Sequence, residues 1–372
     1  MESLVSKLYK QKKLLENYNK KILSSNFYDV PVLPDVDLMY IKESIKMIED
    51  NIELLEKSDN HYNNNFNINK FSRLSKIDLK ELFLFLENYY IKYRYRLGIN
   101  KKITFGVEIE FDDYENYLDT YYFLEDNNIF YNIFEEQSVK GFEINSCILI
   151  DTINDWIDLR KICQFLRKNK ATTNKGNAGG HIHVGLQIFK TEENFDKFLK
   201  CYMLYEDILN RFLCGEYINI RKNAKYYAAL CKNNVYGYES YYKRKKALYL
   251  DKINFKRFKE RNTIEFRRPN GTLNEIIWQN NINAIIKMIL TINKDNFDME
   301  YIDYNINKDI DRIKYKPDSA YDSEINIKKV LEFVDMFYEE NIDKLNFLKQ
   351  YFKNYELTLQ KKELIRTKKF WH

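Results

Sequence analysis

Four short stretches of the chain each carry two polar residues that are separated by a single apolar residue. The pairs are Glu108 and Glu110, Glu143 and Asn145, His181 and His183, and Glu265 and Arg267. Side chains two positions apart on a β-strand point to the same face of the sheet, about 6–7 Å from one another. If each stretch is a strand, each pair therefore lies on a polar face, and the apolar neighbours lie on the other face.

Carboxylates dominate this set, and their mutual repulsion indicates what the face could bind. Glutamates this close together, with no lysine among them, repel one another and tend to take up protons. A divalent cation removes the repulsion, and Mg²⁺ or Mn²⁺ prefers oxygen ligands with an occasional imidazole. The alternative is a set of merely solvated strand faces, but lysine, threonine and serine are absent from the pairs. The predicted metal ligands are Glu108, Glu110, Glu143, Glu265 and one histidine.

The histidine pair follows directly after Gly179 and Gly180, where glycine permits close approach of the backbone to a ligand. The chain has 4 histidines in total. No third histidine or suitable cysteine accompanies the pair, so a structural zinc site is not expected. Both histidines point to the same face, and spacing alone does not decide which one binds metal. His183 is assigned to the metal set, and His181 and His183 are both candidates for catalysis.

Arg267 shares the acidic face, where a guanidinium group can bind phosphate or carboxylate oxygens in a bidentate manner. Arg268 points the other way and is expected at the surface or in an ion pair. Gly271 indicates a turn before a helix that begins near Leu273.

Alternating stretches at 103–111, 141–146, 181–186 and 263–267 predict the strands, and helical spacing predicts helices at 78–98, 153–169, 192–213, 274–292 and 325–367. Strands with one polar face, separated by helices of unequal length, favour an α+β fold over a doubly wound parallel sheet. We divide the chain into an N-terminal helical region (1–98), a catalytic domain (99–295) and a C-terminal helical extension (296–372). An asparagine-rich stretch at 60–71 is predicted to be a loop.

Taken in order, four motifs resemble those of the amidoligase family, within the carboxylate–amine ligase superfamily that also includes glutamine synthetase and glutamate–cysteine ligase. They are FGVEIEF (105–111), GFEINS (141–146), GGHIHVG (179–185) and TIEFRRPNGTLN (263–274). The resemblance covers roughly residues 103–290. It implies a glutamine-synthetase-like curved antiparallel sheet whose concave face holds Mg²⁺ and ATP.

The resemblance also implies roles for individual residues. Glu108, Glu110, Glu143 and Glu265 match the metal-binding glutamates, His181 or His183 matches a histidine that contacts metal or phosphate, and Arg267 matches a phosphate-binding arginine. In IRKNAKYYAAL (220–230), Arg221 and Tyr226 loosely match residues that line the substrate site, although a plain surface helix remains the alternative. The family often has proline after the serine that corresponds to Ser146, whereas this chain has Cys147. Substrate contacts near that turn are therefore left open.

The predicted activity is ATP-dependent ligation of a carboxylate to an amine through an acyl phosphate, with the metal ions bridging the ATP phosphates. Two other classes of function stay open. One is a different metal-dependent enzyme on the same sheet, either a guanidino kinase or a hydrolase. The other is a non-catalytic scaffold in which the helical ends matter most. The expected partners are a small-molecule or peptide carboxylate and amine, and the helical ends could also bury a second copy of the chain.

Overall charge gives little support to nucleic-acid binding. The formal net charge is +5, and 60 basic residues are intermingled with 55 acidic ones. Basic aromatic stretches at 241–250 and 255–261 could attract phosphates, but such runs are more often solvated faces. The 5 cysteines show no metal or redox spacing, and neither a signal peptide nor a membrane span is expected. These features predict a cytoplasmic protein.

Overall fold

The chain divides into two units, Met1–Ile68 and Asn69–His372. The computed structural model describes residues of the second unit only: 73–114, 116–135, 139–173, 178–217, 220–221, 224, 228, 231, 248–249, 263–309 and 327–353. The predictions for the N-terminal helices, the loop at 60–71, the basic stretch at 255–261 and Tyr226 lie outside the described residues, as does 241–250 apart from its strand residues 248–249. The predicted boundaries at 98 and 295 stay predictions.

Six strands of the described residues form one sheet, in the order β2-β3-β1-β4-β6-β5. Their bounds are Phe105–Asp112 (β1), Asn132–Glu135 (β2), Gly141–Asn145 (β3), Gly180–Gly185 (β4), Leu248–Tyr249 (β5) and Thr263–Phe266 (β6). Every pairing is antiparallel. The predicted α+β class with an antiparallel sheet is thereby confirmed, whereas the curved shape stays a prediction. Strands β2 and β5 were not predicted.

The described helices are α3 (Leu79–Asn88), α4 (Tyr117–Asp126), α5 (Ile153–Lys168), α6 (Glu192–Leu213), α8 (Glu275–Ile292), α9 (Met299–Asp309), α10 (Ile327–Phe337) and α11 (Asn341–Tyr351). Side chains cap the helices of the central region where they begin. Thr152, Thr191 and Asn274 accept hydrogen bonds from backbone N–H groups in the first turns of α5, α6 and α8. These caps fix where the long helices start, because the first N–H groups of a helix have no partner within it.

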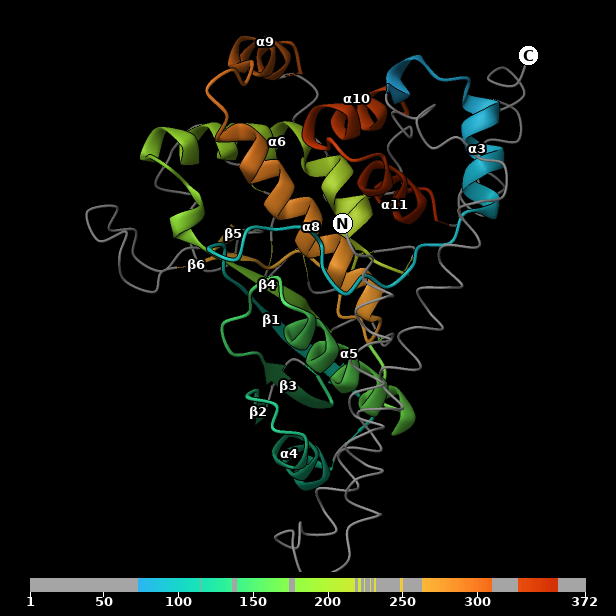
Figure 1. Cartoon of the computed structure of the whole chain (residues 1–372), viewed down its shortest axis with the longest axis vertical. Coiled ribbons are helices and arrows are strands. Elements are labelled where there is room, and N and C mark those ends of the chain that lie inside the picture. Colours follow the sequence, from blue (N-terminus) through green and yellow to red (C-terminus); the bar gives the residue numbers. More distant parts are fainter. Residues whose placement is uncertain are drawn as a thin grey trace, which may run out of the picture. The chain divides into compact units, whose positions relative to one another are not determined.

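Helices α5 and α6 cover the apolar face of the sheet. The ring of Trp156 on α5 stacks on Phe105 of β1, with centroids 5.3 Å apart. Tyr202 on α6 packs against Phe266 of β6 at 6.0 Å. Helix α8 lies next to α6 (Figure 1). Each large side chain buried here stabilises the fold by about 1.5–3 kcal/mol, so the apolar face is fixed and the polar face is left for chemistry.

The single helix predicted at 325–367 is wrong in the described part, because the chain forms two helices. Helix α10 ends at Phe337, and α11 begins at Asn341 after Glu340 adopts an extended backbone. The turn lets Phe333 contact Phe347, with ring centroids 4.9 Å apart. In one continuous helix these residues would lie about 21 Å apart along the axis. Burial of aromatic residues thus outweighs the local helical pattern.

The helix predicted at 78–98 is also too long, since α3 ends at Asn88. Residues 89–98 form neither helix nor strand. Asp151 holds the end of this segment, because its carboxylate accepts hydrogen bonds from the N–H groups of Leu97 and Ile99, both at 2.8 Å. Among the described helices, none is both long and apolar enough to cross a membrane. No disulfide joins the five cysteines.

Candidate functional site

Strand register brings the predicted polar pairs onto one face of the sheet. Glu108 of β1 lies between Asn145 of β3 and His181 of β4. Glu110 lies opposite Glu143, and His183 lies opposite Glu265 of β6. Residues directly opposite on antiparallel strands have Cβ atoms about 4.5–5.5 Å apart. Side chains from four separate stretches of sequence therefore meet in one place.

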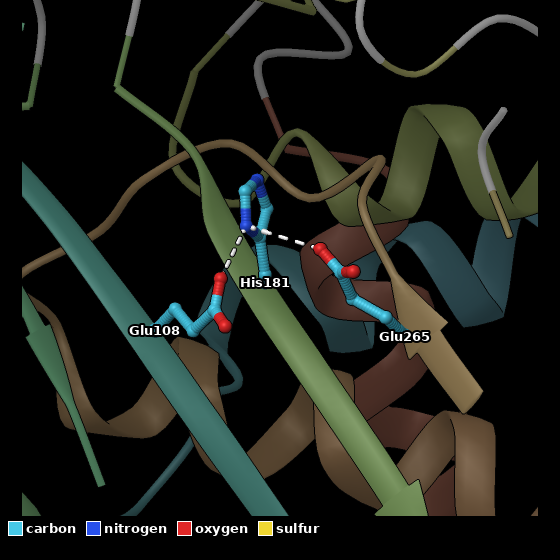
Figure 2. Close-up of side chains that lie close together, drawn as sticks. All are labelled: Glu108, His181 and Glu265. Carbon is cyan, nitrogen blue, oxygen red and sulfur yellow. Dashed lines mark hydrogen bonds and ion pairs between the residues drawn. The ribbon is translucent and has the colours of Figure 1, made fainter. Parts of the chain in front are cut away.

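Glu108 is held by both histidines. Its Oε2 atom lies 2.7 Å from His181 Nδ1, and its Oε1 atom lies 2.9 Å from His183 Nε2. Glu265 approaches the same His181 nitrogen at 3.4 Å, so that one imidazole lies between two carboxylates (Figure 2). Burial of Glu108 raises its pKa, but the two histidine hydrogen bonds outweigh burial and hold the pKa well below its usual value. Glu108 is therefore ionised at neutral pH.

Glu110 and Glu143 form the other end of the cluster. Glu110 is buried and accepts a hydrogen bond from the backbone N–H of Gly179 at 2.5 Å. Glu143 is half-buried, and burial together with the negative charge of Glu108 raises its pKa to about 7. A raised carboxylate pKa is the expected mark of acidic groups gathered without enough positive charge. At Glu143, burial and the neighbouring negative charge therefore outweigh the positive charges nearby.

The donor set fits a hard divalent cation. Two sets of side chains place ligand atoms within 4.8 Å of one another: Glu108 with His181 and Glu265, and Glu110 with Glu143 and His181. Carboxylate oxygens outnumber nitrogens in both sets, as Mg²⁺ and Mn²⁺ prefer. Within the described residues, the buried Oδ1 atom of Asn145 accepts no hydrogen bond, so one more oxygen beside Glu108 is available. His181, rather than His183, is the histidine common to both sets.

The three arginines differ in where they lie. Arg267 is half-buried, and its Nε atom lies 2.8 Å from Glu265 Oε1, on the acidic face as predicted. Arg221 is buried, with Nη1 3.6 Å from Glu110 Oε2. The expectation of a surface position for Arg268 is wrong: its side chain is 2% exposed and donates to Asn210 Oδ1 and to the Ala228 carbonyl oxygen. Its role is to hold the segments around α6 together.

The glycines before the histidines make room for the chain itself. A Cβ atom on Gly179 would overlap the guanidinium of Arg221 and would lie 2.7 Å from His181 Nε2. A Cβ atom on Gly180 would lie 2.6 Å from the Asn270 carbonyl oxygen. The sequence predicted that these glycines let the backbone approach a ligand. In the structure the groups closest to them belong to Arg221, His181 and Asn270 of the chain itself. Any side chain at either position would push the site apart.

Two residues of this face were not predicted. Asp112 lies two positions after Glu110, is 3% exposed and accepts a hydrogen bond from the backbone N–H of Lys140. Continuing the alternation by one step would have found it. Thr263, two positions before Glu265, has its hydroxyl oxygen 3.0 Å from His183 Nδ1. The same alternation places it on this face, but only the pairing of the strands brings it to His183.

Residues 113–289 match a family described as "Putative amidoligase enzyme". The match confirms the resemblance to amidoligases that the motifs predict. The matched residues include Glu143, both histidines, Arg221, Glu265 and Arg267, whereas Glu108 and Glu110 lie just before them.

Among solved structures, the chain is similar to a Plasmodium falciparum glutamine synthetase determined by cryo-electron microscopy, with 17% sequence identity and a TM-score of 0.35. The similarity covers 59% of this chain and 55% of that chain, so the chain spans about half the length of the glutamine synthetase. No curated protein matches the chain.

Proposed function

We propose that this chain is an ATP-dependent carboxylate–amine ligase that forms an amide bond and uses Mg²⁺ or Mn²⁺. The observation that carries the proposal is the convergence of Glu108, Glu110, Glu143 and Glu265 around His181 on one sheet face. The match of residues 113–289, which include Glu143, His181 and Glu265, to a putative amidoligase family supports the same activity. The substrates are a carboxylate and an amine, each carried by a small molecule or a peptide, and the cytoplasmic location stays part of the proposal.

The glutamates are proposed to hold the metal, which when bound supplies positive charge to the phosphates of ATP. Amide formation needs such activation because a carboxylate is a poor acceptor at neutral pH. In the proposed reaction the substrate carboxylate takes the γ-phosphoryl group, ADP leaves, and the amine displaces phosphate from the acyl phosphate and loses a proton. Water must be kept away from that acyl phosphate.

Side chains of the chain itself are proposed to bind the phosphoryl group. Arg267 extends beyond Glu265 on the acidic face and remains partly exposed, so its guanidinium can meet an anionic oxygen. His183 is partly exposed, and its pKa is raised because hydrogen bonding to Glu108 outweighs the effect of burial. A protonated His183 adds a second positive group on the same side of Glu108. Both groups would stabilise negative charge on the transferred oxygens.

A substrate screen tests the proposal. The full chain is incubated with Mg²⁺, ATP and paired pools of carboxylates and amines, including amino acids, polyamines and peptides, and phosphate release is followed. The expected result is phosphate release only when a carboxylate and an amine are both present. Mass spectrometry should then find a product that equals the two substrates minus water. EDTA and the Glu110→Gln variant should each abolish the signal.

Other outcomes would assign the chain to a different class. ADP formed with a guanidino compound alone would indicate a kinase. Turnover without any nucleotide would indicate a hydrolase. Absence of metal-dependent ATP binding in calorimetry would indicate a non-catalytic scaffold, and it would overturn the proposal.

A further inference from the structure

Strand β2 forms one edge of the sheet that carries the acidic cluster (Figure 1). It pairs with β3 on one side, and no strand of the described residues pairs with its other side. An edge strand presents unpaired backbone N–H and C=O groups, which an extended peptide can join as one more strand. The sequence of β2, NIFE, contains neither lysine nor proline, the residues that commonly protect an exposed edge.

Phe134 carries the acidic face out to this edge. It lies directly opposite Glu143 of β3, which in turn lies opposite Glu110 of β1. Directly paired residues of an antiparallel sheet share a face, so the three side chains form one row. The side chain of Phe134 is 48% exposed. A residue of an added strand opposite Phe134 would continue the row, two strand spacings, or about 10 Å, from Glu143.

The surface around β2 is acidic and aromatic. Residues 113–139 include seven acidic residues and no lysine, arginine or histidine, although the chain as a whole has a net charge of +5. Helix α4, which contacts β2, exposes four large side chains: Tyr117, Leu118, Tyr121 and Tyr122. Exposed carboxylates of the same two elements are Asp119, Glu125, Asp126 and Glu135. The complement of such a surface is a basic partner with apolar parts.

An exposed aromatic ring followed by a carboxylate suits lysine in particular. The apolar stem of a lysine can lie on the ring of Phe134 while its charged end stays near Glu143, because long basic side chains bury the stem and keep the charge among polar groups. Lysine also carries an amine that can become part of an amide. Arginine does not serve in this way, since its guanidinium keeps its proton at any ordinary pH.

We propose that the open edge of β2 binds an extended, lysine-rich peptide and that a lysine opposite Phe134 is the amine substrate. The docking stands by itself, whereas the substrate role rests on the proposed function. In that role the ε-amine first loses a proton to water and then attacks the carbonyl carbon of the acyl phosphate. The C–N bond forms, the C–O bond to phosphate breaks, and a second proton of the amine leaves on the phosphate.

The first test measures docking alone, with the full chain, EDTA and no ATP. The probe is a fluorescein-labelled peptide of nine residues in which lysine alternates with valine, and fluorescence anisotropy measures its binding. Two control peptides carry N-methyl groups either on the lysines or on the valines. Successive N–H groups of a strand point to opposite edges, so only one of the two should lose affinity, by about tenfold or more. Equal affinity of all three peptides would overturn the proposal.

Substitutions at the edge test where the peptide binds. Phe134→Ala should weaken binding of the unmodified peptide about three- to tenfold, and Glu135→Lys should weaken it similarly, because each removes an attraction for lysine. Matched controls are Tyr304→Ala on α9 and Glu193→Lys on α6, which change an exposed aromatic residue and an exposed glutamate elsewhere. Equal losses in edge and control variants would contradict the docking site.

The substrate role is tested with Mg²⁺, ATP and the carboxylates of the substrate screen. The peptide should serve as the amine with a KM at least about tenfold below that of free lysine, since several cross-strand pairs add to its binding. Mass spectrometry should locate the new amide on a lysine side chain. A KM equal to that of free lysine would contradict the substrate role.

Two further outcomes separate the proposals. If the peptide binds as expected but no pair of substrates releases phosphate from ATP, the proposed function fails and the docking surface stands. If sedimentation instead shows dimers that Glu135→Lys dissociates, and no peptide binds, the edge belongs to a second copy of the chain and the docking proposal is overturned.

Discussion

The two ends of the acidic cluster hold their carboxylates in opposite ways. At one end, Glu108 accepts hydrogen bonds from His181 and His183, and its pKa is lowered. At the other end, Glu143 faces Glu110 across the strands, and its pKa is raised to about 7. Both glutamates share one sheet face. Burial raises the pKa of both groups, but hydrogen bonds from the two histidines outweigh it at Glu108, whereas at Glu143 the negative charge of Glu108 adds to it.

Two imidazoles offset the charge of Glu108, whereas burial and the charge of Glu108 disfavour ionisation of Glu143, even with Arg221 near Glu110. A cation beside Glu143 would relieve this repulsion. We therefore propose that the Glu108 end is organised without an ion and that a bound ion completes the Glu143 end. Four variants can break or sharpen this contrast.

The largest effect is expected for Glu108→Ala on binding of Mg·ATP. Supporting residues of metal sites are worth 10–100-fold in affinity, and loss of a ligand itself should cost about a thousandfold, or ~4 kcal/mol. Calorimetric titration of Mg·ATP measures it. Glu193→Ala on α6 is the control, because Glu193 lies at the surface and pairs with Lys197 on the same helix. If Glu143→Ala abolished binding of Mg·ATP while Glu108→Ala left it intact, the assignment of Glu108 as the more important ligand would be contradicted.

A smaller loss of metal affinity is expected for Gly179→Ala. The new methyl group would displace Arg221 and crowd His181 Nε2, and the N–H that holds Glu110 would move with them. Affinity for Mn²⁺ should fall about 10–100-fold, as for other residues that orient metal ligands. Manganese EPR titration measures the affinity. A matched substitution at Gly98 should lower stability without changing metal affinity, because φ there is +77° and no atom of the described residues lies within 4 Å of the added carbon.

Glu108→Gln should destabilise the metal-free protein by about 2 kcal/mol. Glutamine keeps the shape but loses the charge, and hydrogen bonds to charged groups exceed neutral ones by about 1 kcal/mol each. Two such bonds, to His181 and His183, are affected. Urea unfolding in EDTA at pH 7 provides the value. A free energy of unfolding equal to that of the wild type would mean that the two histidines do not stabilise the Glu108 carboxylate in the metal-free protein.

Glu143→Gln should instead stabilise the metal-free protein, and its change in the free energy of unfolding should be the smallest effect of the four variants. The pKa of Glu143 is raised from 4.5 to about 7 in the folded protein, so the folded state keeps an extra proton between these values and stability falls as pH rises through them. At pH 8 the variant should therefore be more stable by about 1 kcal/mol, a modest gain because solvent screens this half-buried group. At pH 4.5 the gain should vanish. Urea unfolding in EDTA at both pH values tests the sign.

Much of the site could be predicted from alternation alone. Period-two spacing places Glu108 and Glu110 on one face wherever the strand lies, because successive side chains point to opposite faces. The strands that carry the chemistry were found for that reason. Strand β2, NIFE, was missed because four residues with one buried side chain hardly constitute a pattern.

Other features depend on contacts between distant parts of the chain. Nothing in the spacing of His181 and His183 distinguishes them, and only the neighbouring strands make His181 central. Arg221 lies forty positions after His181 on a segment without regular spacing. The break between α10 and α11 likewise follows from packing of Phe333 on Phe347. Tertiary packing decides such details, and local propensity does not carry them.

The position of His181 in both ligand sets has a consequence for how the site responds to change. Because one ring borders each set, replacing a glutamate in the first set alters the surroundings of the second. Energies of paired substitutions across the cluster will therefore not add, as they would for residues without a shared neighbour. A substitution at one glutamate would be tolerated only together with a compensating substitution at another. The residue types at these positions are therefore constrained as a group.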